Sequence, residues 1–359
     1  MSDSIQERAR YKPLVLVDTG NLPRNKWLEW RRKGIGGSDV AAIMGISPFH
    51  TARDIYYDKL RIVPLEEEEE DEFDDSWVAK EMGNLLEPLV AKIFQKKTGF
   101  EVFQVKKMFY HPQHPFMLAD VDYFVRLPDG TIAILEIKTT DDSRVGEWYK
   151  DGEKIVPIYY ESQGRHYMAV TDIDRVFFCC LYGRSEDNVI IREIKRDYEY
   201  EDEMIFLEQD FWEENVKKKI VPPYTESGKL VLESAVNHAG PADPKAPAMS
   251  LNAKMSSTLM RYMQLQEEKK NSDKESKQIE NEMQRLKGIL IAEMNTNCTA
   301  VCEQDGQEFT VTYNPVRKTT IDKDGLLRLE LLYPDIYKQF VKTSESRRFY
   351  VKVSKADAA

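Results

Sequence analysis

Three charged residues on two neighbouring predicted strands are the strongest candidates for chemistry in this sequence. The apolar run 132–138 contains Glu136 and Lys138, which are two residues apart and therefore point to the same face of a strand. Asp122 lies in the apolar stretch that precedes this run, and the turn residues 128–130 (Pro-Asp-Gly) separate the two stretches. The sequence thus predicts a hairpin that brings two carboxylates and a lysine together, close enough to share a divalent metal ion. The alternative is a cross-strand salt bridge on the surface.

A third carboxylate could enter the same site from a helix. Residues 83–94 have the apolar spacing of a helix, and Glu87 lies next to the apolar stripe. Alternatively, Glu87 is only an acid that the helix dipole favours in the first turn. With Glu87, the group of charged residues is nuclease-like.

The stretch 30–39 suggests a phosphate site. It combines the basic triplet Arg31-Arg32-Lys33, a glycine-rich turn and Ser38, which begins a predicted helix at 40–44. Arginines and the backbone amides at a helix N-terminus bind phosphate groups. The alternative is an ordinary helix cap after a loop.

Together these residues resemble the YqaJ-type viral recombinase family, relatives of the phage lambda-type exonucleases within the PD-(D/E)xK nuclease superfamily. The resemblance covers roughly residues 25 to 215. Its pieces occur in the family's order: Arg31 to Asp39, Gly83 to Glu87, Ala119 to Asp122, Leu135 to Lys138, and Gln163 to His166. One departure is visible, because the family often reads Ser-Pro-Asp-Gly where this chain reads Asp120-Val121-Asp122-Tyr123. We assign the family's acid to Asp122, since it has the matching spacing from the preceding alanine.

The resemblance implies a role for each residue of the acidic group. Asp122 and Glu136, with the backbone carbonyl of Ile137, would hold one or two Mg²⁺ or Mn²⁺ ions through oxygen ligands. Glu87 would join them through a metal-bound water. Lys138 would orient or help deprotonate the attacking water and stabilise charge on the phosphate.

The resemblance also implies positions for the substrate. Gln163 would touch the nucleophile or the scissile phosphate, although an exposed helical glutamine is an equal alternative. Arg31, or Arg32 beside it, would hold a 5′-terminal phosphate together with Ser38. His166 is expected to contact a phosphate or to serve in packing.

The expected protein is an α/β nuclease with a restriction-endonuclease-like core, a mixed central sheet flanked by helices. The resemblance implies 5′-to-3′ degradation of linear double-stranded DNA, with the 3′ strand passed to a single-strand annealing protein. It also implies a homo-oligomer and a phage or prophage protein in the bacterial cytoplasm. Two alternatives remain: a structure- or sequence-specific endonuclease on the same core, and a catalytically silent DNA-binding or anti-defence module.

Composition constrains the partners. The net charge of −11 is unusual for a DNA-binding protein, but the run 66–75 alone carries nine acidic residues and is expected to be a solvated insertion at 65–76.

No apolar run reaches membrane-spanning length, and the N-terminus has no hydrophobic signal core. The residues that could form a basic DNA-binding face are Arg31, Arg32, Lys33, Lys106, Lys107 and Lys217 to Lys219.

The four cysteines are expected to serve in packing. Cys179 and Cys180 lie in a buried-strand pattern, and the other two, Cys298 and Cys302, are distant from them in sequence. This spacing does not fit the four-cysteine iron–sulfur cluster that some nuclease relatives carry.

The domain organisation follows from changes in pattern along the chain. The nuclease domain is expected at 1–225, a linker at 226–250, a long amphipathic helix or helical hairpin at 251–297, and a small β-rich module at 298–359. Five residues of the last module could contact DNA or could simply lie on solvated strand faces: Arg317, Lys318, Arg347, Arg348 and Tyr350.

Overall fold

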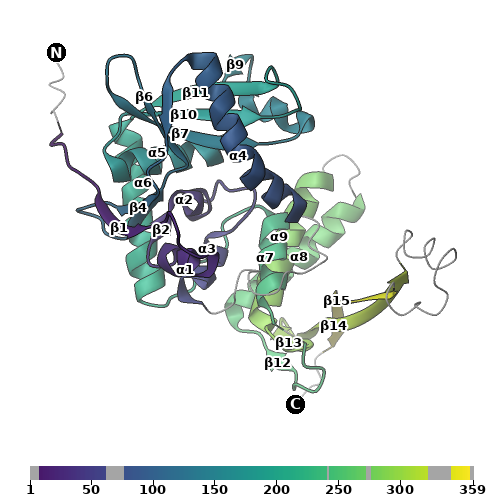
Figure 1. The fold of residues 1–359 in the computed structure, drawn as a ribbon. Helices are drawn as coiled ribbons and strands as arrows, with labels where there is room; N and C mark the ends of the chain where they lie inside the picture. Colours follow the sequence, from purple (N-terminus) through teal and green to yellow (C-terminus); the bar gives the residue numbers. More distant parts are fainter. Residues whose placement is uncertain (1–7, 62–76, 241, 272–275, 322–340, 356–359) are drawn as a thin grey trace, which may run out of the picture. The chain divides into compact units, whose positions relative to one another are not determined.

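The computed structural model describes residues 8–61, 77–240, 242–271, 276–321 and 341–355 (Figure 1). The chain divides into two units, Met1–Thr225 and Glu226–Ala359. The boundary lies where the sequence predicts the nuclease domain to end. The acidic insertion at 65–76 lies outside the described residues.

The first unit is built from short strands and helices around one larger sheet. Its elements are β1 (Leu14–Asp18), α1 (Arg24–Arg31), β2 (Ile35–Gly36), α2 (Gly37–Ile43), α3 (Ala52–Leu60), α4 (Trp77–Thr98), β3 (Glu101–Phe103), β4 (Lys107–Tyr110), β5 (Met117–Asp120), β6 (Tyr123–Arg126), β7 (Ile132–Thr139), η1 (Asp142–Trp148), β8 (Tyr149–Lys150), β9 (Glu153–Lys154), α5 (Ile158–Thr171), β10 (Arg175–Leu181), β11 (Val189–Lys195), α6 (Tyr198–Asp210) and η2 (Phe211–Lys217).

The larger sheet has the strand order β11-β10-β7-β6-β3, with β10 parallel to β7 and the other pairs antiparallel. The central strand β7 is covered on both faces, which explains its nearly continuous apolar sequence. Leu135 and Ile137 belong to the hydrophobic cluster that includes α4, whereas Ile134 belongs to the cluster that includes α5. Both helices lie beside the sheet (Figure 1). The expected mixed sheet flanked by helices is confirmed.

The predicted hairpin is also confirmed, with one difference. β6 pairs with β7 through a turn in which Gly130 adopts a φ of 82°, a value that favours glycine. The stretch 117–123, which reads as a single strand in the sequence, instead comprises β5 and the first residue of β6, and these two strands lie in different sheets. β5 lies in a second sheet of order β1-β4-β5-β2, so the chain passes from one sheet to the other at Val121 and Asp122.

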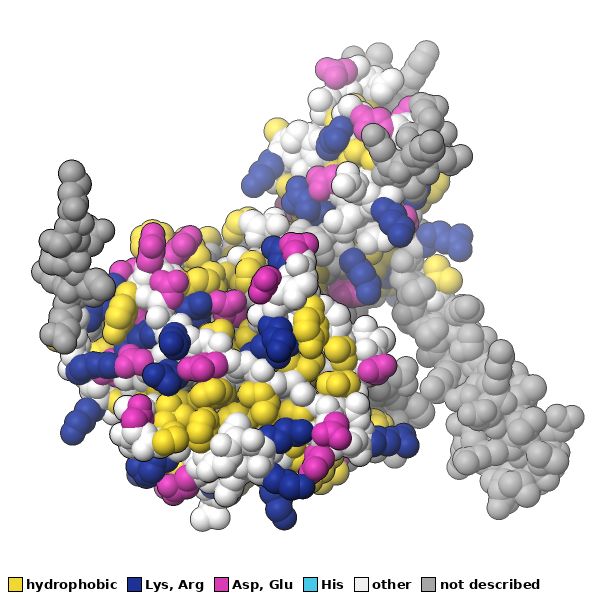
Figure 2. All heavy atoms as spheres, turned by 90° about the horizontal axis from the view of Figure 1, so that it is seen from above, with side chains coloured by type: hydrophobic (Ala, Val, Ile, Leu, Met, Phe, Trp, Pro, Cys, Tyr) yellow, Lys and Arg dark blue, Asp and Glu magenta, His cyan; other side chains and the backbone are white. Residues whose placement is uncertain are grey.

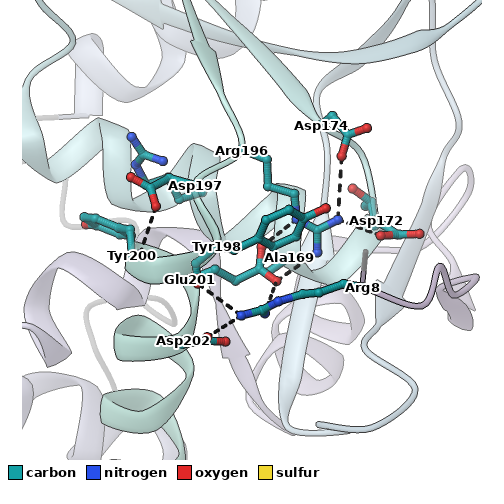
Figure 3. A network of polar contacts seen from close by, with 12 residues as sticks. Arg8, Ala169, Asp172, Asp174, Arg196, Asp197, Tyr198, Tyr200, Glu201 and Asp202 are labelled. Carbon is teal, nitrogen blue, oxygen red and sulfur yellow. Dashed lines mark hydrogen bonds and ion pairs between the residues drawn. The ribbon is translucent and has the colours of Figure 1, made fainter. Parts of the chain in front are cut away.

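An N-terminal arm is fastened to the first unit by a network of ion pairs (Figure 3). Arg196 pairs with Asp172 and Glu201, each at 2.6 Å. Arg8 pairs with Asp202, and Arg10 pairs with Asp174. The arm is thereby held against the end of α5 and the start of α6.

Charged side chains of both signs lie on one face of the molecule. On the face shown in Figure 2, Lys and Arg side chains are interspersed with Asp and Glu rather than gathered in one patch.

Cys179 and Cys180 are fully buried in β10, in keeping with a packing role. Within the described ranges, no helix is both long and apolar enough to span a lipid bilayer.

The second unit differs from the sequence-based expectation at its start. The segment 226–250, expected to be a linker, contains helix α7 (Gly228–His238) and strand β12 (Met249–Ser250). Leu230 and Val231 of α7 are buried, and Gly288 lies so close that an added Cβ would be 3.0 Å from Val231. The glycine and proline residues of 226–250 led to the prediction of a linker. Helix α7 forms there because it packs against α9.

The remaining elements of this unit form a helical pair and a sheet. They are α8 (Ala253–Asn271), α9 (Ser276–Met294), β13 (Thr299–Gln304), β14 (Gln307–Ile321) and β15 (Val341–Lys355). The helices pack together and cover one face of the sheet β12-β13-β14-β15 through Leu259, Leu290 and Val311. A long helix or a helical hairpin was expected at 251–297, and the structure has two helices there that pack together; the β-rich module is also present.

Close packing between α5 and β10 leads to a first prediction. A methyl group on Gly164 would lie 2.6 Å from Phe178 Cζ and 3.0 Å from Val176 Cγ1, and both side chains are fully buried. Overpacking costs about 1–3 kcal/mol, whereas Ala gains about 1 kcal/mol over Gly in a helix. We expect Gly164→Ala to lower the free energy of unfolding, measured by urea denaturation.

The matched control is Gly83→Ala on α4, where the nearest atom to the new methyl is Thr139 Oγ1 at 3.8 Å. This substitution should raise the free energy of unfolding by up to about 1 kcal/mol. Equal stabilisation by both substitutions would contradict the packing described for α5.

Candidate active site

A hydrogen-bonded group of three side chains lies between strand β7 and helix α5. Lys138 Nζ donates to Glu136 Oε1 at 2.6 Å and to Gln163 Oε1 at 2.9 Å, and Gln163 Nε2 donates to Glu136 Oε1 at 2.6 Å. The sequence predicts the shared face of Glu136 and Lys138 correctly. This face is not an open surface, however, because α5 covers it and Glu136 is only 2% exposed.

The ammonium group of Lys138 is held in its charged form. Its Nζ also lies 4.8 Å from the centroid of the Tyr160 ring. Burial opposes the charge, but the carboxylates of Glu136 and Asp122 outweigh burial and raise the pKa of Lys138.

Asp122 reaches this group from the point where the chain leaves β5 for β6. Its Oδ2 accepts a hydrogen bond from the Ile137 N–H at 3.0 Å. Burial and the nearby Glu136 carboxylate raise the pKa of Asp122, and burial likewise raises the pKa of Glu136. Asp120, the neighbouring acid, accepts instead from Trp27 Nε1 at 2.5 Å.

Glu87 approaches from α4, in the middle of the helix rather than in its first turn. Partial burial raises the pKa of Glu87 to about 7, and the Asp122 and Asp120 carboxylates act in the same direction. The pKa values of Glu87, Asp122 and Glu136 are therefore all raised, and neighbouring carboxylates contribute to each shift. The site has too little positive charge nearby to balance these carboxylates.

The donor set suits a divalent cation such as Mg²⁺. Glu136 Oε2 is buried and has no hydrogen-bond partner among the described residues. The Ile137 carbonyl points to the same side of β7 as its N–H, the side on which Asp122 lies. In the part of the chain that the structure describes, no three His, Cys, Asp or Glu side chains enclose a metal ion by themselves. Mg²⁺ commonly uses one or two carboxylates and completes its shell with water and substrate phosphate oxygens, so these residues fit it.

A cavity of about 390 Å³ connects the carboxylates with the basic segment. Glu87 and Asp122 line it together with Arg31, Ser38 and Lys106. The acidic group and the phosphate-binding group that the sequence predicts therefore face one space.

Arg31 is oriented by its neighbours. Its Nη2 donates to Ser38 Oγ at 2.6 Å and to Asp39 Oδ1 at 2.8 Å, and its guanidinium lies 5.6 Å from the Trp27 ring centroid. Asp39 is buried and also accepts from Lys59 Nζ at 2.7 Å. Burial would raise the pKa of Asp39, but Lys59 and Arg31 hold it well below its usual range.

Two residues expected near phosphate lie elsewhere. Arg32 Nε donates to Asp58 at 2.8 Å, and Arg32 does not line the cavity. His166 is fully buried, with Nδ1 2.8 Å from Glu208 and Nε2 2.9 Å from the Leu118 carbonyl. Both ring nitrogens of His166 are used within the fold, so packing is its role and the expected phosphate contact is wrong.

Sequence reasoning missed the buried Asp39–Lys59 pair and the tyrosine behind Gln163. Tyr167 lines the cavity, and its hydroxyl accepts from Gln163 Nε2 at 3.2 Å. Lys59 lies in a helix of mixed polarity where nothing in the local pattern marks a buried lysine. The glycine at position 37 was an indirect sign of a bulky neighbour. A Cβ there would lie 2.6 Å from Tyr167, so only glycine fits beside this ring.

Comparison with known proteins identifies the domain that contains this site. Residues 26–174 match the family of the YqaJ-like viral recombinase domain. We call this matched segment the YqaJ-like domain. The match confirms the resemblance to the YqaJ-type viral recombinase family that the sequence indicates.

Individual relatives are similar over different lengths. The uncharacterised protein YqaJ of Bacillus subtilis (strain 168) is 29% identical over 341 residues, which are 94% of this chain and 97% of YqaJ. The alkaline exonuclease LHK-Exo of Laribacter hongkongensis is 20% identical, and the two structures superpose with a TM-score of 0.43. The match covers 54% of this chain and 93% of the LHK-Exo chain. A phage-related exonuclease from Haemophilus somnus 129PT is 15% identical over 52% of this chain and 96% of its own, with a TM-score of 0.39.

The raised pKa of Glu87 leads to a prediction about stability. A carboxyl group whose pKa is about 4 in the unfolded chain and about 7 in the folded protein lowers the stability progressively as the pH rises from 4 to 7. Glu87→Gln should therefore gain stability over wild type across this range. Because solvent screens the partly exposed Glu87, we expect a gain of only about 1–2 kcal/mol at pH 8 without divalent metal. Urea unfolding in EDTA at pH 4, 6 and 8 measures the difference.

The control is Glu81→Gln, an exposed glutamate of the same helix. It removes a carboxylate from the exposed surface of α4 and so reports what the change from Glu to Gln does to the helix itself. A stability difference for Glu87→Gln that is constant from pH 4 to 8 would show that Glu87 titrates normally.

Proposed function

We propose that the YqaJ-like domain is a Mg²⁺-dependent exonuclease that digests linear double-stranded DNA from its 5′ ends. The main support is the single cavity lined by Glu87 and Asp122 and by the oriented Arg31 and Ser38. Carboxylates suited to a metal and a guanidinium suited to a terminal phosphate face the same space. Such a cavity fits a phosphodiester close to a DNA end.

Asp122, Glu136 and the Ile137 carbonyl would hold the ion, with Glu87 acting through a water. When bound, the ion would lower the pKa of water and neutralise charge on the phosphate. Lys138 keeps its proton and would donate to a phosphate oxygen, because its raised pKa makes it a poor base. Gln163 holds Lys138 and Glu136 in place and is near enough to orient the attacking water.

Release of a 3′ single strand would suit recombination by strand annealing. The viral recombinase description of the matched family supports this role. We include as partners a single-strand annealing protein and further copies of this chain. Double-stranded DNA ends are the proposed substrate.

The first test removes the charged group one residue at a time. Asp122→Ala, Glu136→Ala and Lys138→Ala should each reduce digestion of linear DNA by at least about 100-fold, since each loses a metal ligand or a positive charge beside the phosphate. Release of nucleotides from end-labelled duplex measures the rate. EDTA should abolish it, and Mg²⁺ or Mn²⁺ should restore it.

Asp187→Ala serves as the control because this acid is 86% exposed and distant in sequence from the group. It should retain the wild-type rate. Wild-type activity in any of the three site variants would refute the assignment of that residue. Equal digestion of covalently closed circles would favour an endonuclease.

The second test concerns polarity and uses the two adjacent arginines. A charge-assisted contact between Arg31 and a 5′ phosphate is worth about 1.5–3 kcal/mol, so Arg31→Ala should slow digestion of phosphorylated ends by roughly 10- to 100-fold. Ends without the phosphate should be poor substrates for wild type and little worse for the variant.

Arg32→Ala provides the matched control. Arg32 pairs with Asp58 away from the cavity, so its loss should lower stability without changing the preference for phosphorylated ends. Equal losses on both kinds of end for Arg31→Ala would argue against 5′-phosphate recognition by Arg31.

A further inference from the structure

The sheet of the second unit has two chemically different faces. Alternate residues of β15 point to opposite sides. Phe349 and Val351 face the helices, where Phe349 lies 5.4 Å from the Tyr262 ring. Arg348, Tyr350 and Lys352 point to the other side and are exposed, Tyr350 by 58%.

The neighbouring strand adds hydroxyl groups to the same face. In the register of β14 and β15, Thr312 lies opposite Tyr350, and Thr310 lies opposite Lys352. Residues directly opposite each other share a face of the sheet. We call the surface formed by Thr310, Thr312, Arg348, Tyr350 and Lys352 the β15 face.

Arg347, another residue expected to contact DNA, does not belong to the β15 face. Its guanidinium donates to the carbonyls of Tyr313, Asn295 and Asn297 at 2.6–2.9 Å. It therefore fastens β15 to the end of α9. This anchoring fixes which side of the strand Arg348 and Tyr350 occupy.

We infer that the β15 face binds single-stranded DNA. An exposed aromatic ring between two cations on one strand matches a base that stacks and two phosphates that flank it. Among the β15 residues whose side chains the structure describes, 347–352, Arg348 and Lys352 are exposed and none is acidic, so the charge of this face is complementary to a polyanion.

The spacing favours a single strand over a duplex. Successive residues on one face of a strand are about 6.8 Å apart, twice the rise per residue. This distance exceeds the roughly 3.4 Å between stacked nucleotides of one strand in B-form DNA, so it suits an extended strand. In a duplex the base faces are also stacked and cannot reach Tyr350.

Acidic residues limit the surface at one end. Glu303 and Glu308 lie opposite each other beside the β13–β14 turn, and Glu308 shares a face with Thr310. These carboxylates would repel phosphates, which directs the DNA strand along Tyr350 and Arg348. The site goes beyond the proposed cleavage reaction and does not depend on it.

Binding to the full chain in EDTA tests the inference without cleavage. The probes are a labelled oligothymidylate of roughly 20 nucleotides, longer than most single-domain sites, and a blunt duplex. Fluorescence anisotropy should show about tenfold weaker binding of the oligothymidylate by Tyr350→Ala, whereas Tyr350→Phe retains stacking and binds like wild type. Arg348→Ala and Lys352→Ala should each reduce the slope of log K against log salt by about 0.7.

Lys229→Ala is the control, because Lys229 is 78% exposed on α7 of the same unit. It should bind both probes like wild type. Unchanged oligothymidylate binding by Tyr350→Ala would overturn the inference, and so would an equal loss on the duplex. Initial digestion of linear duplex in Mg²⁺ should be the same for Tyr350→Ala and wild type, which separates this result from the proposed nuclease activity.

Discussion

The first unit depends on how a buried central strand accommodates charge. β7 is covered by helices on both faces, yet it carries Glu136 and Lys138 on the side of α5. An isolated buried ion is very unfavourable, so each needs the other and both need Gln163. This requirement fixes the position of α5 relative to the sheet. It also leaves one oxygen of Glu136 without a hydrogen-bond partner among the described residues, and the proposed cation site rests on this feature.

A second buried ion pair places the arginine opposite the carboxylates. Asp39 accepts from Lys59, from Arg31 and from the Gly36 N–H, so α1, α2 and α3 meet at one carboxylate. Arg31 consequently enters the cavity with little freedom. Pre-organised groups lose less entropy when a ligand binds, which supports the proposed recognition of a phosphate by the planar guanidinium of Arg31.

The sequence predicted local features better than the contacts between distant segments. Alternation along 132–138 and the turn at Gly130 were sufficient for the β6–β7 hairpin, and helical spacing was sufficient for the region of Glu87. The division of 117–123 between two sheets depends on non-local pairing of β5 with β4 and β2, which no local pattern reveals. For the same reason the sequence left the role of His166 open between phosphate contact and packing, and the partner of Arg32 and the packing of α7 on α9 were missed.

The N-terminal arm has a consequence for how the chain folds. Arg10 and Tyr11 make their contacts with Asp172 and with the Ala169 carbonyl, partners about 160 residues away in the sequence. At a synthesis rate of about 5–20 residues per second, the ribosome needs roughly 10–30 s to produce those partners. The arm is therefore synthesised well before its partners, and it cannot be fixed until they have been made. Until then it lacks the ion pair and the hydrogen bonds that hold it in the folded protein.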